Sequence, residues 1–143
     1  MKIAICVSLD FVPKIKDFSD QLTKLGHKVT IPQTAEMILN GKVTFDQIMK
    51  EKGNGEISNR AIKQGSFKYY FEKIKEVDAI LILNFEKRGI EGYIGGNTFL
   101  EMGFAHILNK KIFLLNEIPE MLYKDEIKAM QPIVLDGDLS KIQ

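Results

Sequence analysis

Short apolar runs alternate with amphipathic stretches along the 143 residues of the chain. The runs at 2–8, 78–84 and 111–115 are apolar almost without interruption, which indicates strands that are buried on both faces. Two further runs, at 27–31 and 132–135, have strand length and end near turn residues or at the chain's short tail. The pattern therefore predicts five strands.

Between the strands, apolar residues recur at helical spacing. This spacing predicts helices over 12–25, 58–76 and 98–108, and a further short helix before the last strand. Residues 33–57 have a weaker pattern, which is compatible with two short helices separated by Asn40-Gly41 and followed by a turn. An irregular insert of this length is typical of a lid or a binding loop.

Strands that alternate with helices predict one α/β domain over residues 1–143, with a doubly wound, Rossmann- or flavodoxin-like, five-stranded parallel sheet flanked by helices. In the common strand order 2-1-3-4-5, the order reverses between the first and third strands, and ligands bind outside the carboxyl ends of the strands at that point. This topology brings the loop at 7–13 opposite the loop at 84–101. The two loops locate the expected site before any motif is considered.

Composition and net charge limit the classes of partner that the chain is expected to bind. The net charge is +1, so there is no electrostatic argument for a nucleic acid or a membrane surface as partner. The single cysteine, Cys6, lies in an apolar run and fits a core residue in a reducing compartment. The apolar run at the N-terminus is too short for a signal or an anchor, so we expect a cytoplasmic protein. No His, Cys or Asp cluster has the spacing of metal ligands, and we expect no metal.

The most informative segment precedes and begins the helix at 98–108. Gly95 and Gly96 lack side chains, so a ligand can approach the backbone N–H groups there. We expect Asn97 to cap the helix, Thr98 to begin it, and Glu101 to lie in or just after its first turn. The helix dipole then favours the ionised form of Glu101, which attack on an anomeric carbon needs. Gly95, Gly96, Asn97 and Thr98 are accordingly the expected ligand-binding residues beside it.

The same residues allow a purely structural alternative. Asn97-Thr98-x-x-Glu101 overlaps an N-terminal capping box, in which a glutamate three residues after a serine or threonine only satisfies backbone N–H groups. Spacing alone leaves both interpretations open.

Three runs carry a family resemblance: D-A-I-L-I-L-N at 78–84, G-G-N-T-F-L-E-M-G-F-A at 95–105 and N-K-K-I-F-L-L at 109–115. Together they resemble the nucleoside 2-deoxyribosyltransferase-like superfamily, which includes 2'-deoxynucleoside 5'-phosphate N-hydrolases. Members have a strand that begins with Asp-Ala, a helix start of the form Gly-Thr-x-x-Glu-x-Gly-x-Ala, and a Lys-x-Ile strand. The resemblance is weaker over residues 1–31 and absent from the insert.

The resemblance implies an activity and a set of roles. The superfamily glutamate attacks C1' of the deoxyribosyl group and expels the base, and this role falls on Glu101. Polar residues at strand ends hold the sugar or base, which points to Asn84 and Asn116, while the first loop binds sugar or phosphate through Ser8 and Asp10. The implied function is N-glycosidic bond cleavage or deoxyribosyl transfer on a small nucleoside or nucleotide, by a homo-oligomer and without a cofactor.

Two other functions are compatible with the same segment. A non-catalytic nucleotide-binding module is favoured by Val7 and Asn97, which stand where most relatives carry glycine. A phosphoribohydrolase of the "lonely guy" type, acting on nucleoside monophosphates, is suggested by a partial match to Gly-Gly-x-Gly-Thr-x-x-Glu. That family uses a catalytic arginine, and Arg88 is the candidate for it here.

Overall fold

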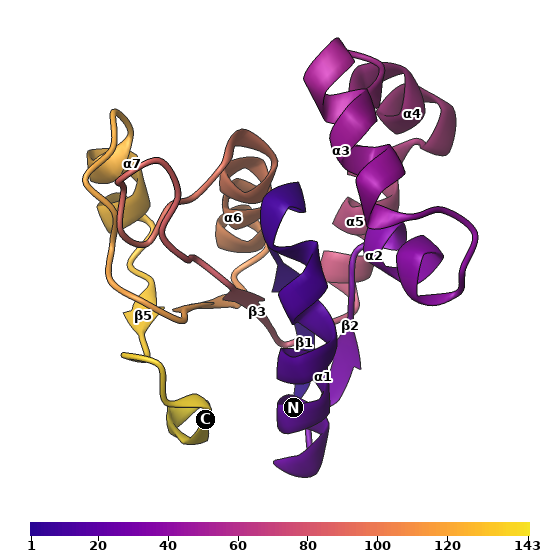
Figure 1. Cartoon of the computed structure of the whole chain (residues 1–143). Helices are drawn as coiled ribbons and strands as arrows, with labels where there is room; N and C mark the ends of the chain where they lie inside the picture. Colours follow the sequence, from indigo (N-terminus) through magenta and orange to yellow (C-terminus); the bar gives the residue numbers. More distant parts are fainter.

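The computed structural model describes residues 1–143, and its five strands form one parallel sheet in the order β2-β1-β3-β4-β5 (Figure 1). The predicted doubly wound α/β fold with a five-stranded parallel sheet is therefore confirmed. Pairing is in register from β1 across β3 to β4, with Ile5 opposite Leu81 and Leu81 opposite Phe113. The strands are β1 (Lys2–Cys6), β2 (Lys28–Thr30), β3 (Ala79–Ile82), β4 (Lys111–Leu114) and β5 (Ile133–Val134).

Alternate side chains of each strand enter two separate cores. Ile3 and Ile5 of β1 face the core on the α1 side, whereas Ala4 and Cys6 face the core on the α5–α6 side. In Figure 1, α1 lies in front of the sheet and α6 behind it. The first core is covered by η1 (Leu9–Lys14), α1 (Ile15–Lys24) and η2 (Leu139–Lys141), and the second by α5 (Ser66–Lys75), α6 (Gly96–Ile107) and α7 (Lys124–Ala129).

Residues 33–64, which we call the insert wall, form three helices beside the carboxyl edge of the sheet (Figure 1). Two of them stand where short helices were expected. Thr44 caps the second, because its side chain accepts a hydrogen bond of 3.1 Å from the backbone N–H of Gln47. The helices are α2 (Gln33–Leu39), α3 (Phe45–Asn54) and α4 (Ile57–Gln64).

The single helix predicted over 58–76 is wrong. Gly65 adopts a left-handed conformation, with φ of 59°, and divides the segment into α4 and α5. A glycine has no Cβ to clash in this conformation, so it ends a helix readily, and its N–H bonds back to the last turn of α4. None of the helices is both long enough and apolar enough to cross a membrane.

Candidate functional site

Two adjoining pockets lie at the carboxyl edge of the sheet, where the strand order reverses between β1 and β3. The first, the floor pocket, has a volume of about 100 Å³, and the second, the mouth pocket, about 310 Å³. Leu9, Ile57 and Asn97 line both. Small-molecule sites typically measure about 300–1,000 Å³, so the two pockets together reach this range.

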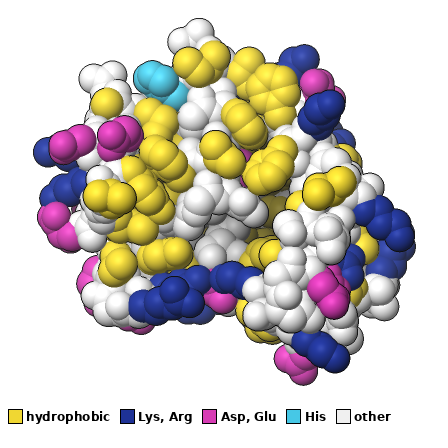
Figure 2. Space-filling view, turned by 90° about the horizontal axis from the view of Figure 1, so that it is seen from above, with side chains coloured by type: hydrophobic (Ala, Val, Ile, Leu, Met, Phe, Trp, Pro, Cys, Tyr) yellow, Lys and Arg dark blue, Asp and Glu magenta, His cyan; other side chains and the backbone are white.

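Figure 2 views this edge from above. Hydrophobic side chains flank a pale hollow on two sides, and Lys and Arg side chains form a row along a third side. The floor pocket includes Val7, Gln33, Arg60, Tyr70 and Glu101, and the mouth pocket includes Ser8, Lys52, Lys87, Arg88, Tyr93 and Thr98.

Glu101 lines the floor pocket from the second turn of α6. The helix begins at Gly96 with Gly95 as its N-cap, so the expected cap at Asn97 is wrong, and Glu101 lies beyond the first turn. Neither bond of a capping box forms here. The buried Thr98 hydroxyl has no hydrogen-bond partner, and the Glu101 side chain accepts no bond from a backbone N–H at the start of α6. The capping-box alternative is therefore wrong, and Glu101 is free to serve the pocket.

The expected ionisation of Glu101 is also wrong. Burial raises the pKa of its carboxyl from 4.5 to about 8, and the neighbouring Cys6 thiol lowers it only in part. The dipole is of little help because its effect falls off within the first turn. No lysine or arginine forms an ion pair with Glu101. At pH 7 the free protein therefore carries Glu101 mainly as the neutral acid.

Asp10 has the opposite surroundings at the mouth pocket. Its carboxylate accepts hydrogen bonds from Lys52 at 2.6 Å, from Lys87, and from the Ser8 hydroxyl at 3.2 Å. Burial by itself raises the pKa of Asp10, but the hydrogen bonds and charges of Lys52 and Lys87 outweigh it and lower the pKa to about 2. Asp10 is thus ionised at neutral pH and joins η1, α3 and the β3–α6 loop.

The start of α6 is open to the mouth pocket. Gly95 and Gly96 line it together with Asn97 and Thr98, as expected for residues that offer backbone N–H groups to a ligand. A Cβ at Gly95 would lie 3.7 Å from the Ser8 hydroxyl, so the first loop and the start of α6 lie close together. The structure thus brings five of the expected binding residues together around one pocket.

Asn84 does not line either pocket. It is fully buried, and its side-chain N–H₂ donates to the carbonyls of Gly92, Asn116 and Glu117 at 3.0–3.2 Å. Its side-chain oxygen accepts from the Asn116 N–H at 2.9 Å, and the Asn116 amide returns a bond of 2.8 Å to the Asn84 carbonyl. Asn84 and Asn116 therefore join the β3–α6 and β4–α7 loops instead of facing a ligand.

Several pocket residues had no usable signal in the sequence. Lys52 and Arg60 come from the insert wall, whose place beside the sheet cannot be deduced from its pattern. Arg60 is held by Glu51 in a two-point ion pair of 2.6 and 2.7 Å, which fixes α4 against α3. Gln33 has a buried side-chain oxygen without a partner, and Tyr70, which belongs to the second core, also lines the floor pocket.

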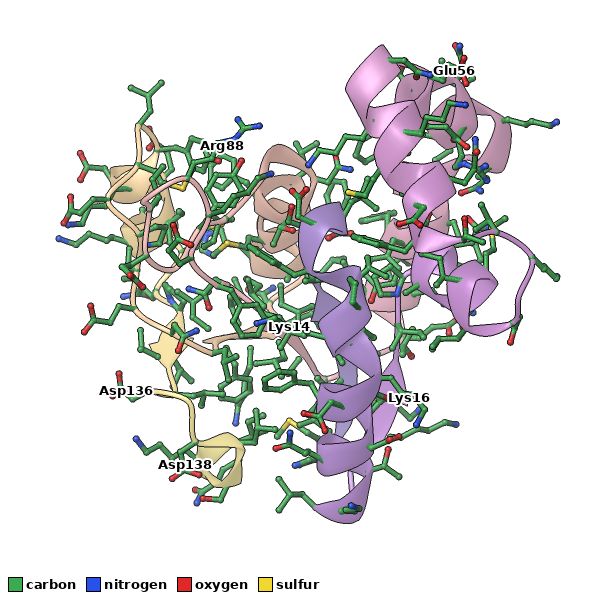
Figure 3. The ribbon with its side chains drawn as sticks, in the orientation of Figure 1. Lys14, Lys16, Glu56, Arg88, Asp136 and Asp138 are labelled. Carbon is green, nitrogen blue, oxygen red and sulfur yellow. The ribbon has the colours of Figure 1, made fainter.

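Arg88 lies apart from Glu101. It is exposed on the β3–α6 loop with φ of 52°, and it lines the mouth pocket, not the floor pocket. Figure 3 shows its side chain above the sheet, to the left of α6 and across the molecule from α3 and α4. An arginine in this place can bind an anion at the mouth pocket. It does not share a pocket with Glu101, as a catalytic arginine acting together with Glu101 would.

In comparisons with protein-family models, with curated proteins and with solved structures, no match to this chain was found. The chemistry of the site therefore rests on its geometry. A half-buried carboxyl group without an ion-pair partner lies at the floor, and a cluster of cations lies at the mouth. Such a site suits a ligand with an anionic end and a neutral, electrophilic centre.

Proposed function

We propose that the chain cleaves the N-glycosidic bond of a nucleoside or nucleotide, with Glu101 as nucleophile. The observation that carries this proposal is the Glu101 carboxyl itself, which lines a pocket at the switch point and makes no structural hydrogen bond to the backbone. A desolvated carboxyl group that no cation pairs lowers stability, and a functional role would account for its presence.

The chemistry follows from a carboxylate beside an anomeric carbon. One Glu101 oxygen forms a bond to C1' of the sugar as the bond from C1' to the base nitrogen breaks. The electron pair of that bond leaves with the base, which takes up a proton. Water then attacks C1' and releases the sugar, or a second base takes the sugar in a transfer reaction, and Glu101 is regenerated.

Glu101 must lose its proton before it attacks. With a pKa of about 8, about one molecule in ten of the free protein carries the carboxylate at pH 7. The departing base needs one proton, and Glu101 releases one proton when it becomes the nucleophile. The motif resemblance over 95–105 to the deoxyribosyltransferase-like superfamily supports the same role for Glu101.

The direct test is base release by wild-type protein and by Glu101→Gln. A panel of the four 2'-deoxynucleosides and their 5'-monophosphates is incubated with each protein, and free base is separated by chromatography. We expect wild type to release base from at least one member of the panel and Glu101→Gln to lose at least about a thousandfold in kcat. Glu126→Gln, an exposed carboxylate on α7, is the matched control and should behave as wild type.

A covalent intermediate gives an independent readout. Rapid acid quench should yield intact wild-type protein with the added mass of one deoxyribosyl group, and no such species from Glu101→Gln. Base release at a near-native rate by Glu101→Gln would overturn the proposed mechanism.

A second candidate function is a nucleotide-binding module without turnover. The Val7 side chain lines the floor pocket beside Glu101, and this pocket measures only about 100 Å³. Its bulk favours binding without a reactive approach of C1' to the carboxylate. Stabilisation of the fold by a nucleotide, with no base released over hours, would select this function.

We also propose that the chain acts as a homo-oligomer. Ile62, Phe67, Leu100 and Ile107 are exposed apolar residues on α4, α5 and α6. Light scattering after gel filtration tests this directly, and a monomer at micromolar concentration would contradict it.

A further inference from the structure

The floor pocket by itself is small for a ligand that has to reach Glu101. Its volume is about 100 Å³, whereas small-molecule sites typically measure about 300–1,000 Å³. One side of this pocket is formed by Ile57, Arg60 and Ala61 of α4, and Lys52 and Ile57 line the adjoining mouth pocket. Access to Glu101 therefore depends on the position of the segment that carries these residues.

Helices α3 and α4 form one unit, residues 42–64, which we call the hairpin. Glu51 on α3 accepts hydrogen bonds of 2.6 and 2.7 Å from the Arg60 guanidinium on α4, and one of 2.9 Å from Gln47. Glu51 is only 5% exposed, and separating the partners of a buried ion pair is strongly unfavourable. We therefore expect the two helices to move together.

The hairpin makes little contact with the two cores. Phe45 is the single hairpin residue that packs against the first core, and none packs against the second. Helix α4 has no buried residue. Figure 1 shows both helices projecting beyond the carboxyl edge of the sheet, and Figure 3 shows Glu56 at their far tip. Segments with few buried apolar contacts are those that open most readily.

Glycines in the left-handed conformation stand at both ends of the hairpin. Gly41 has a φ of 75° and Gly65 a φ of 59°, and a Cβ at either position would meet nothing within 4 Å. Glycine adopts positive and negative φ about equally well, so the backbone can change conformation at both ends without a steric clash. These two residues are suited to act as hinges.

One ion pair joins the hairpin to the opposite side of the site. Lys52 Nζ lies 2.6 Å from the Asp10 carboxylate of η1, and the two side chains are 35% and 27% exposed. Apart from contacts of Gln64 next to the hinge, this is the hairpin's only side-chain hydrogen bond to the rest of the chain. A partly exposed ion pair of this kind is weak enough to break and form again at room temperature.

We propose that the hairpin is a lid, which rotates as one piece about Gly41 and Gly65 and which the Lys52–Asp10 ion pair holds closed. When the pair breaks, α4 moves away from the floor pocket and Glu101 becomes accessible to a ligand larger than the closed pocket. When the pair forms again, the lid encloses the ligand and excludes water. The lid does not depend on which reaction takes place at Glu101.

A thiol at the floor pocket measures the opening of the lid. Val7→Cys in a Cys6→Ala background supplies the only thiol, and N-(1-pyrenyl)maleimide, which is too large for the closed floor pocket, labels it. Adding Lys52→Met removes the ion pair but keeps the aliphatic stem, so the labelling rate should rise by about three- to fivefold. Lys52→Arg keeps the ion pair and should leave the rate unchanged.

Three controls separate the lid from other causes of faster labelling. Lys63→Met, exposed on α4, is the matched control and should not change the rate at Val7→Cys. A thiol at Lys24→Cys, exposed on α1, should react equally fast with and without Lys52→Met. Raising the salt concentration from about 0.05 M to about 1 M screens the ion pair, so it should speed labelling only where Lys52 is present.

Amide hydrogen exchange distinguishes a lid that moves as one piece from local unfolding. Faster labelling with α3 and α4 still protected supports the lid. Faster labelling with loss of protection throughout both helices would show that they unfold, and would overturn it. Equal labelling with and without Lys52→Met, at low and at high salt, would overturn it too. Labelling needs no turnover, so these outcomes are independent of whether the chain releases a base.

Discussion

Asp10 and Glu101 carry the two carboxyl groups of one site, and their surroundings move their pKa values in opposite directions. Asp10 is at the mouth, where Lys52 and Lys87 outweigh desolvation and lower its pKa to about 2. Glu101 is at the floor, where burial without a cation raises its pKa to about 8. Neighbours, not residue type, thus set the charge at each end. At neutral pH the mouth pocket therefore has charged groups on both sides, whereas the floor pocket has a protonated carboxyl group that can release its proton.

The largest expected effect is on stability. Because the folded-state pKa of Glu101 is raised from 4.5 to about 8, the wild-type protein loses stability as the pH rises between these values. Glu101→Gln removes the ionisable group and keeps the shape, so we expect it to raise the free energy of unfolding at pH 7 by about 2–3 kcal/mol.

Urea unfolding of both proteins at pH 4 and pH 7 measures this difference. At pH 4, where Glu101 is mostly protonated in both the folded and unfolded states, the two proteins should have nearly equal stability. A variant that is less stable than wild type at pH 7 would contradict the raised pKa.

The next effect is on the pH dependence of the proposed reaction. If attack needs the Glu101 carboxylate, kcat/KM should rise by about tenfold between pH 6 and pH 7 and level off above a pH of about 8. Initial rates of base release at subsaturating substrate, measured from pH 5.5 to pH 9.5, give this profile. A rate that falls over the same interval would indicate that Glu101 acts as an acid.

A smaller and opposite effect is expected at the mouth. Asp10→Asn leaves Lys52 and Lys87 without their carboxylate, so the free energy of unfolding at pH 7 should fall by about 1 kcal/mol, since Asp10 is partly exposed. The contribution of Asp10 is present above its unfolded-state pKa of 3.8 and is lost as the pH falls towards about 2.

Thermal or urea unfolding from pH 7 to pH 2.5 should therefore show the wild type and Asp10→Asn converging in acid. Asp20→Asn, which removes an exposed ion pair on α1, is the control and should change stability far less. Equal loss in the two variants would mean that the mouth cluster is an ordinary surface pair.

The smallest effect concerns the thiol beneath the floor. Cys6 lowers the pKa of Glu101 in part, so Cys6→Ala should move the midpoint of the Glu101 titration upward by less than about one pH unit. Carbon-13 NMR of the glutamate carboxyl groups follows this titration whether or not the protein is active. A downward shift would show that the thiol does not stabilise the carboxylate.

The sequence predicted the sheet and the meeting of the two loops, because the apolar runs that define the strands are local patterns. The apolar runs at 2–8, 78–84 and 111–115 are strands of the observed sheet, and the order 2-1-3-4-5 is confirmed. The two loops expected to face each other do so across the mouth pocket, where Ser8 and Gly95 lie close together.

The features that the sequence did not predict depend on contacts between segments that lie far apart along the chain. Helix α6 starts two residues earlier than expected, so Glu101 lies beyond its first turn, and the burial that raises the pKa of Glu101 is visible only in the folded chain. Lys52 is one lysine among many in the sequence, and nothing local distinguishes it before α3 brings it to Asp10. Asn84 had the expected position at a strand end, but its bonds to two loops became visible only in the folded chain.

The break between α4 and α5 at Gly65 has a consequence for which substitutions the site can accept. It separates α4, which lines the floor pocket, from α5, which packs on the sheet through Tyr70 and Ile74. The helix that lines the pocket and the helix that packs on the sheet therefore meet at one residue, although the insert wall also places Ala35 in the first core. Substitutions on α4 can therefore change the neighbours of Glu101 in the floor pocket and leave the sheet-packing face of α5 as it is.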